Sequence, residues 1–263
     1  MTTSPETSTT RSRREVDVEL PVGFLDDDGR LHKNATLRKM TGHEEAILAD
    51  RKLRKNGGKL VSELLTGCVR RLGEVDRISR PVVAKLCSPD RNFLLLKLRT
   101  ITFGDQLEAS YTCPHCGETT PITEDLDALP VRRTNGDGPG EIVVELEDGY
   151  EDNDGSFYTS MVFRLPTGSD EEKVASISRE NASQGMNALL TRCLVGLGDM
   201  PEPRRQALGT KVLADLTMGD RARIDRAFRG GMPGVDLLRE VECSSCMRTF
   251  KASLDFTSFF SLQ

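Results

Sequence analysis

Two Cys-x-x-Cys pairs are the residues of this chain whose type and spacing best suit chemistry. The first pair is Cys113 and Cys116, in YTCPHCGETT, and the second is Cys243 and Cys246, in VECSSCMRTF. A Cys-x-x-Cys turn presents two thiolates to one metal ion, and four thiolates close a tetrahedral zinc site. We therefore expect one structural zinc ion per chain, with each half of the sequence supplying half of its ligands.

Two other interpretations of the cysteine pairs stay open. A thiol oxidoreductase places its Cys-x-x-Cys at a helix N-terminus, where the dipole lowers the thiol pKa, whereas both pairs here lie between segments that alternate like strands. A site that has lost its metal is the second alternative. Gly117 follows the first pair and can turn left-handed. Met247 stands at that place in the second pair, so we expect its turn to close differently.

The remaining polar residues do not suggest catalysis. His115 lies inside the first pair, but Cys116 next to it completes that pair, so His115 is expected to point outward. His32 and His43 fall in a hairpin strand and at a helix start, without a catalytic partner. A catalytic zinc keeps an open coordination position, which four thiolates do not leave. No P-loop, GxSxG, HExxH or GxGxxG motif occurs, so we expect no enzyme and no catalytic residues.

The chain also resembles itself. Residues 64–75, LLTGCVRRLGEV, match residues 189–200, LLTRCLVGLGDM, at six of twelve positions. Two further pairs of segments correspond, residues 37–45 with 163–171 and residues 82–91 with 212–221. The offsets of 125, 126 and 130 residues are too long for a solenoid unit and indicate duplication of a whole module.

Each copy is expected to open with a β-hairpin and to close with a β-ribbon that carries its cysteine pair. Turns at 26–29 and 152–155 contain Asp-Gly between alternating apolar residues, which is a strong hairpin signal. The segments around the cysteine pairs, such as Leu107, Ala109 and Tyr111, alternate apolar with polar residues. We expect the two copies to be related by a pseudo-twofold axis at the shared metal.

Helices are expected between the hairpin and the ribbon. Capping-box spacing pairs Thr41 with Glu44 in the first copy, and Ser169 with Glu172 in the second. In the first copy, helices are predicted over residues 43–51 and 60–72, and in the second copy over 170–180 and 186–197; one further helix follows in each copy.

Three cysteines lie outside the pairs. Cys68 and Cys193 occupy the same apolar helix face in the two copies, and Cys87 has no counterpart; we expect all three to be buried as apolar residues. Asp90 and Asp220 are expected to be N-caps of the last helix of each copy.

Two apolar segments suggest contact with a protein partner. The last helix of the first copy has four consecutive apolar residues, which cannot share one helix face, so it is either buried on several sides or partly a docking surface. The C-terminus is apolar as well and either folds back on the ribbon or inserts into a partner. The candidate partner-binding residues are Phe93, Leu94, Leu95, Leu96, Phe256, Phe259 and Phe260.

Composition excludes several classes of protein. A net charge of −5 argues against nucleic acid as an obligatory partner. No apolar run approaches the roughly 18 residues of a membrane helix, and the first residues lack the apolar region of a signal peptide. We therefore expect a cytoplasmic protein without a membrane partner, in which cysteines stay reduced.

The expected fold class is α+β, with a duplicated module of β-hairpin, short helices and β-ribbon knuckle, and with the two knuckles joined in a central four-cysteine zinc ribbon. The expected organisation is a disordered leader over 1–15, a first module over 16–130, a linker over 131–141 and a second module over 142–263.

One run of residues has a family resemblance. The segment 90–105, DRNFLLLKLRTITFGD, followed by Cys113-Pro-His-Cys116-Gly117, with MTGHEE and LLTGCVRRLG upstream, resembles the baseplate hub assembly chaperone family of T-even-like phages. The likeness is clearest over about residues 35–125 and recurs weakly over 160–260. It implies an assembly factor or minor structural component of the baseplate hub, in a contractile phage tail or a phage-derived contractile injection system. The implied partners are hub, spike or tape-measure proteins, and no catalytic residues carry over.

A zinc-ribbon regulator that binds nucleic acid is the alternative function. The basic loop at 51–59 could contact phosphates. Against this alternative stand the acidic net charge, the absence of tryptophan and the small number of tyrosines, which leave no clear stacking platform for bases.

Overall fold

The computed structural model describes residues 14–135, 138–254 and 260. The first half contains β1 (Glu15–Leu25), β2 (Leu31–Arg38), α1 (Gly42–Ala49), the 3-10 turn η1 (Leu53–Lys55), α2 (Gly57–Cys68), β3 (Val69–Leu72), α3 (Arg80–Lys85), α4 (Ser88–Phe103), β4 (Gln106–Thr112) and β5 (Thr119–Asp125). The short strand β6 (Val131–Arg132) follows. The second half contains β7 (Glu141–Glu151), β8 (Phe157–Arg164), α5 (Gly168–Glu180), α6 (Ala182–Cys193), β9 (Leu194–Leu197), α7 (Glu202–Leu208), α8 (Lys211–Asp215), α9 (Met218–Gly231), β10 (Gly234–Val235), β11 (Leu238–Glu242) and β12 (Thr249–Ser253).

The fold is a mixture of helices and small antiparallel sheets, as expected at that level, and its two halves share most of their elements in the same order. The second half has an additional short helix, α7, and its short strand β10 precedes the ribbon, whereas β6 follows it. Each half opens with a three-stranded sheet, β1-β2-β3 or β7-β8-β9, and ends with a two-stranded ribbon, β4-β5 or β11-β12. The hairpins at the Asp-Gly turns are present with the expected antiparallel pairing. A short pair, β6-β10, adds one further link between the halves.

The third strand of each sheet corrects one expectation. The helices predicted over 60–72 and 186–197 end at Cys68 and Cys193, and the chain continues directly as β3 and β9. Leu72 and Leu197 are therefore strand residues, although both are fully buried. The physical reason is tertiary: the edges of β2 and β8 offer hydrogen-bonding partners, which the residues after each helix pair with.

The helix starts were only partly predicted. Thr41 and Glu44 form the expected capping box of α1. The box of α5 is formed by Thr167 with Asp170, so the prediction of Ser169 with Glu172 was wrong by two residues. The shift leaves Glu172 free to contact the first half.

Asp90 and Asp220 are not N-caps, because α4 and α9 begin two residues earlier, after Cys87 and Thr217. Both carboxylates are fully buried and hold the irregular part of the first strand of their half. Asp90 accepts hydrogen bonds from the amides of Val22 and Gly23. Asp220 accepts from the amides of residues 147, 148 and 149. Each carboxylate thereby satisfies backbone donors that the neighbouring strand leaves unpaired.

The core decides between the two expectations for α4. The four apolar residues Phe93, Leu94, Leu95 and Leu96 are all at most 3% exposed. Phe93, Leu94 and Leu95 lie in the core of the first half, and Leu96 lies in a separate core beneath the ribbons. A helix buried on several sides, the alternative for this segment, is therefore what the structure shows.

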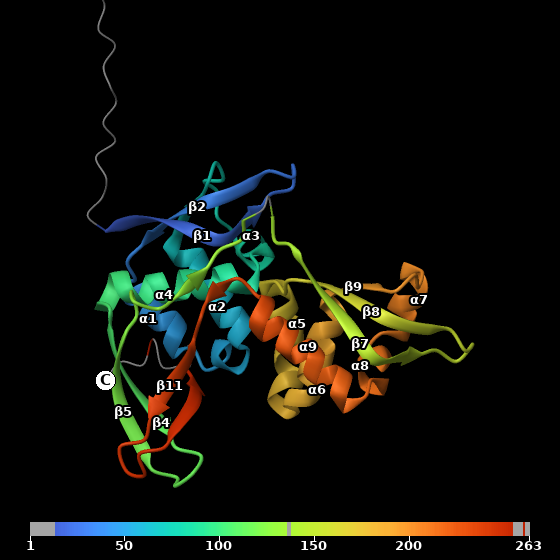
Figure 1. Cartoon of the computed structure of the whole chain (residues 1–263). Coiled ribbons are helices and arrows are strands. Elements are labelled where there is room, and N and C mark those ends of the chain that lie inside the picture. Colours follow the sequence, from blue (N-terminus) through green and yellow to red (C-terminus); the bar gives the residue numbers. More distant parts are fainter. Residues whose placement is uncertain (1–13, 136–137, 255–259, 261–263) are drawn as a thin grey trace, which may run out of the picture.

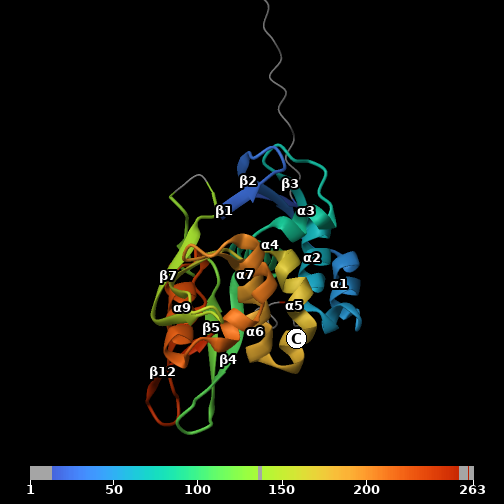
Figure 2. The same cartoon turned by 90° about the vertical axis from the view of Figure 1, so that its right-hand side faces the viewer.

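The two halves meet in two different ways. The ribbons lie side by side, with their turns at one end of the molecule (Figures 1 and 2). The helices instead follow one another in a row, in which α1 packs on α2, α2 on α5 and α5 on α6. Because α5 is the counterpart of α1, the contact between α2 and α5 joins unlike parts of the halves. A single pseudo-twofold axis, as expected from the sequence, does not describe this arrangement. In the described part of the chain, no helix is both long and apolar enough to cross a membrane.

Candidate metal centre

The first cysteine pair occupies the turn between β4 and β5. The amide of Cys113 donates to the carbonyl of Glu118, and the amide of Gly117 donates to the carbonyl of Cys113. Gly117 has the expected left-handed conformation, with φ of 78°. The amide of His115 points at Cys113 Sγ, 3.4 Å away.

The second pair closes in the same way, which corrects the expectation of a different turn. Between β11 and β12, the amide of Cys243 donates to the carbonyl of Arg248, and the amide of Met247 donates to the carbonyl of Cys243. Met247 reaches this geometry with φ of 58°, a left-handed conformation that costs a residue with a Cβ about 1–2 kcal/mol. Its side chain is 66% exposed, so no clash is added to that cost.

The four sulfur atoms form one cluster and all lie within 4.8 Å of one another. Cys113 Sγ is 3.7 Å from Cys246 Sγ, and Cys116 Sγ is 3.6 Å from Cys243 Sγ. A tetrahedral zinc with bonds of about 2.3 Å separates its sulfur ligands by about 3.8 Å. A disulfide requires about 2.05 Å. The spacing therefore fits a metal and not cystines. Each short distance joins the first cysteine of one pair to the second cysteine of the other pair. The two ribbons are therefore related by a local twofold axis at the cluster.

The surroundings of the cluster shift the pKa values of two of its thiols in opposite directions. Amide N–H groups of Cys246 and Ser245 lower the pKa of Cys243 to about 6. At Cys116 the amide of Glu118 also lowers the pKa, but desolvation and hydrogen bonds with the other three thiols outweigh it and raise the pKa to about 12. Cys243 is therefore mostly a thiolate at neutral pH, and a divalent metal would displace the remaining protons.

A small core beneath the cluster fixes the two ribbons to each other. It contains buried residues of both ribbons, including Cys113 and Cys243, and Leu96 of α4. A polar link crosses it: Tyr111 donates to Glu124 over 2.7 Å, and Arg239 of the other ribbon lies 3.4 Å from the second oxygen of that carboxylate. The cluster is thus held by packing on one side and faces solvent at Cys116, which is exposed.

The other candidate chemical groups lie elsewhere. His115 is exposed, as expected. His32 is 7% exposed, and its Nε2 lies 2.8 Å from Asp26 Oδ2 in the first hairpin. Cys68, Cys87 and Cys193 are buried as predicted. Desolvation raises the pKa of Cys68 and of Cys193 to about 12, which makes them poor ligands and nucleophiles.

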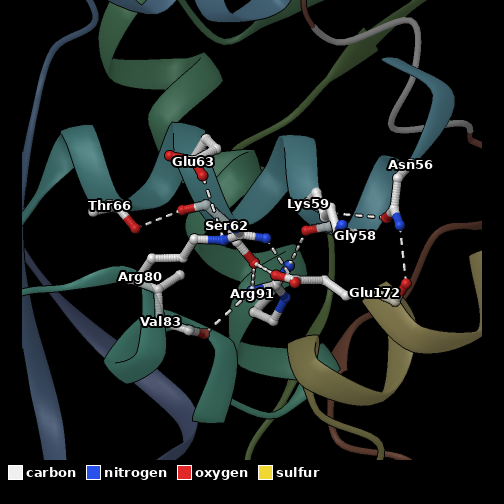
Figure 3. Close-up of polar contacts among 10 residues, drawn as sticks. All are labelled: Asn56, Gly58, Lys59, Ser62, Glu63, Thr66, Arg80, Val83, Arg91 and Glu172. Atoms are coloured by element: carbon white, nitrogen blue, oxygen red, sulfur yellow. Dashed lines mark hydrogen bonds and ion pairs between the residues drawn. The ribbon is translucent and has the colours of Figure 1, made fainter. Parts of the chain in front are cut away.

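A buried polar site that the sequence did not predict lies where the halves meet at α2, α4 and α5 (Figure 3). Its centre is Arg91, whose side chain is fully buried. The guanidinium donates to Ser62 Oγ over 3.1 Å, to the carbonyl of Val83 over 3.2 Å and to the carbonyl of Gly58 over 3.0 Å. Its Nε lies 3.3 Å from Glu171 of α5. Burial lowers the pKa of Arg91, and the two acidic residues of α5 counteract that effect.

Glu172 completes this site from the second half (Figure 3). Its carboxylate accepts from Ser62 and pairs with Arg80 over 2.8 Å, and its carbonyl accepts from the side-chain amide of Asn56 over 2.9 Å. The Asp-Arg pair that occurs at both 90–91 and 220–221 was the one sequence signal that could have indicated this site. It does not reveal that only the first arginine is fully buried, because that burial depends on packing between the halves.

The C-terminal candidates were placed in part. Phe256 and Phe259 lie outside the described residues. Phe260 is half-buried, packs against the cores of the first half and of the ribbons, and lines an open pocket of about 860 Å³ between α1, α2 and α4. This residue therefore folds back on its own chain.

Comparison with known proteins gives one match. A family model described as T4 bacteriophage base plate protein matches residues 24–261. No curated protein and no solved structure matches the chain significantly.

Proposed function

Since this chain belongs to the family of T4 bacteriophage base plate proteins, we propose that it acts in the baseplate hub, as an assembly factor or minor structural component without enzymatic activity. The observation that carries the proposal is the family match over residues 24–261, which spans both halves and both cysteine pairs. The resemblance to hub assembly chaperones supports a role in the hub itself, as an assembly factor or minor component. The same reasoning applies to the baseplate of a contractile injection system derived from a phage.

The proposed mechanism is binding to other baseplate proteins. Hub, spike or tape-measure proteins are the partners that this role requires, and the chain would meet them in the cytoplasm of the host before or during their incorporation into the tail. The two modules, over 16–130 and 142–263, would have arisen by duplication, which accounts for their shared order of elements.

We propose that the cysteine cluster holds one structural zinc ion. Four sulfur donors at tetrahedral spacing suit zinc better than magnesium or calcium, which prefer oxygen ligands. Because four protein ligands leave no open position, the ion would stabilise the fold and would not activate water. Cys113 and Cys116 would bind from the first half, and Cys243 and Cys246 from the second, so the ion would join the ends of both ribbons.

A pull-down during infection, or from cells that express the complete tail operon, tests the proposed role. A tagged chain and a matched chain with all four ligands changed to serine are isolated, and bound proteins are identified by mass spectrometry. The proposal expects hub, spike or tape-measure proteins with the native chain and fewer of them with the variant. Recovery of nucleic acid or transcription proteins in their place would support the regulator alternative and contradict a baseplate role.

A further inference from the structure

The contact between the halves is built from parts that occur twice in the chain but meet only once among the described residues. On one side is the first socket, formed at the starts of α2 and α4 by Asn56, Gly58, Ser62 and Arg91. On the other side is the α5 turn, residues 166–172, which fills the socket. Backbone bonds from Ser88 N to the carbonyl of Pro166 and from Gly168 N to the carbonyl of Leu86 align the two.

The second half contains a counterpart of this socket at the starts of α6 and α9. Asn181 caps α6 through its side chain as Asn56 caps α2. Arg221 donates to the carbonyl of Leu213 over 2.7 Å, which is the bond that Arg91 makes to Val83. With Asn187 in place of Ser62 and Thr217 in place of Cys87, these residues define the second socket, which comprises Asn181, Asn187, Thr217 and Arg221.

Among the described residues, three groups at or beside the second socket lack partners of the kind that Ser62, Thr66 and Arg91 have in the first half. Asn181 and Thr217 are hydrogen-bonded within the chain. Asn187 Oδ1 and Thr191 Oγ1 are buried atoms without a hydrogen-bond partner in the described structure. Arg221 is half-buried and has no acidic partner within ion-pair distance among the described residues. Met218, which begins α9 beside it, is 80% exposed. Native proteins rarely leave such groups unsatisfied, so they point to a ligand.

The first half, in turn, contains a copy of the α5 turn that enters no socket among the described residues, although Met40, Thr41 and Glu45 of this copy line the pocket that holds Phe260. The α1 turn, residues 40–46, has the same capping box as the α5 turn and the same Thr-Gly start. A Cβ on Gly168 would lie 2.3 Å from the Arg91 guanidinium, whereas one on Gly42 would meet nothing within 4 Å. Glu45 stands where Glu171 pairs with Arg91, and its side chain is exposed.

We propose that a second copy of this chain docks its α1 turn into the second socket. Glu45 of one copy would pair with Arg221 of the next. The backbones of residues 41 and 217 would form the counterpart of the bridge between Thr167 and Cys87. This contact is heterologous, because a turn on one copy meets a socket on the next. It leads to head-to-tail association and does not depend on the proposed baseplate role.

Three differences make the second contact weaker than the first. Ala46 replaces Glu172, so the pairing with an Arg80 counterpart is absent. Met218 replaces Ser88, whose hydroxyl donates to Glu171. Ser183 replaces Gly58, where a Cβ would come within 2.7 Å of the backbone of the docked turn. The docked α1 turn must therefore stand farther from α6, and the association is reversible and sensitive to salt.

Sedimentation velocity of the purified full-length chain over a wide range of concentrations tests the proposal. The native chain is expected to gain weight-average mass with concentration at low salt and to lose that gain at high salt. Glu45→Arg or Arg221→Glu alone should keep the chain monomeric. The double variant, and an equimolar mixture of the two single variants, should associate again, since both restore opposite charges. Glu240→Arg, on the exposed face of β11, controls for the change in net charge.

A native chain that stays monomeric at all concentrations overturns the proposal. If the native chain stays monomeric and Arg221→Glu abolishes the binding of a different baseplate protein, the second socket binds that protein and the proposal is overturned. The proposal is also overturned if both single variants still associate, or if neither the double variant nor the mixture of single variants associates. Circular dichroism of each variant verifies that loss of association does not follow from loss of fold.

Discussion

Replacing Arg91 with methionine should destabilise the chain far more than the same change at Arg221. Arg91 is fully buried, serves two carbonyls and a hydroxyl, and pairs with Glu171. Removing one partner of a buried ion pair costs about 3–5 kcal/mol, because the groups left behind lose their compensation. Since 29% of the Glu171 side chain is exposed and can regain water, we expect the lower end, about 3 kcal/mol.

Arg221 is the matched control. It holds the equivalent place in the second half but is half-buried and donates to one carbonyl, that of Leu213. A single hydrogen bond of this kind contributes about 1 kcal/mol. At about 2–4 °C per kcal/mol for a chain of this size, the expected losses in melting temperature are about 6–12 °C for Arg91→Met and about 2–4 °C for Arg221→Met.

The assay is urea unfolding, followed by far-ultraviolet circular dichroism with saturating zinc and at low protein concentration. Similar m-values in the two variants would show that the same surface is exposed on unfolding. If the two substitutions cost the same free energy within about 0.5 kcal/mol, Arg91 does not carry the contact between the halves, and the interpretation of Figure 3 is wrong.

Three further predictions concern the cluster and the first capping box. Chelation of the metal, or Cys113→Ser, should lower the melting temperature and abolish stoichiometric zinc, while His115→Ala should retain it; loss of zinc in the histidine variant would make that residue a ligand. Met247→Gly should stabilise the chain by about 1 kcal/mol and Gly117→Ala should destabilise it by a similar amount, both measured by urea unfolding, because both positions are left-handed. If both substitutions stabilise the chain, or both destabilise it, the left-handed geometry of the two turns is refuted. Burial raises the pKa of Glu44, but hydrogen bonds, chiefly from a paired arginine, outweigh it and lower the pKa to about 2. Stability from this group is therefore present above about pH 4.5 and lost as the pH falls through about 2, and Glu44→Gln should show a flatter acid limb in stability measured from pH 6 to pH 2; an unchanged limb would contradict the shift.

Features encoded locally were predictable from the sequence. The Asp-Gly hairpins and the cysteine turns depend on neighbouring residues, and the cysteine cluster followed from the repeat. The conformation of Met247 was not predictable in this way, because glycine is the usual signal for a left-handed turn and its absence suggested another geometry. Met247 adopts the left-handed conformation because both cysteine turns must have the same backbone to bring four sulfurs together. This requirement outweighs the preference of a residue with a Cβ for other conformations.

Features that depend on contacts between distant segments were missed or misplaced. The ends of α2 and α6 at Cys68 and Cys193 are set by strand pairing, which helical periodicity does not reveal. The aspartate of each Asp-Arg pair was placed at a helix cap, although its task is to satisfy amides of a strand about 70 residues away. The burial of Arg91 beneath α5 arises from the row of helices, whereas the symmetric sequence copies suggested a symmetric arrangement.

The central claim is that both halves build one zinc site from four sulfurs, and zinc analysis with X-ray absorption of the reduced full-length chain tests it most directly. We expect one zinc per chain, with four sulfur neighbours at about 2.3 Å and no nitrogen or oxygen bound to the metal. A chain that folds fully without metal, or a zinc with fewer than four sulfur ligands, would contradict the claim that the cluster joins the two ribbons.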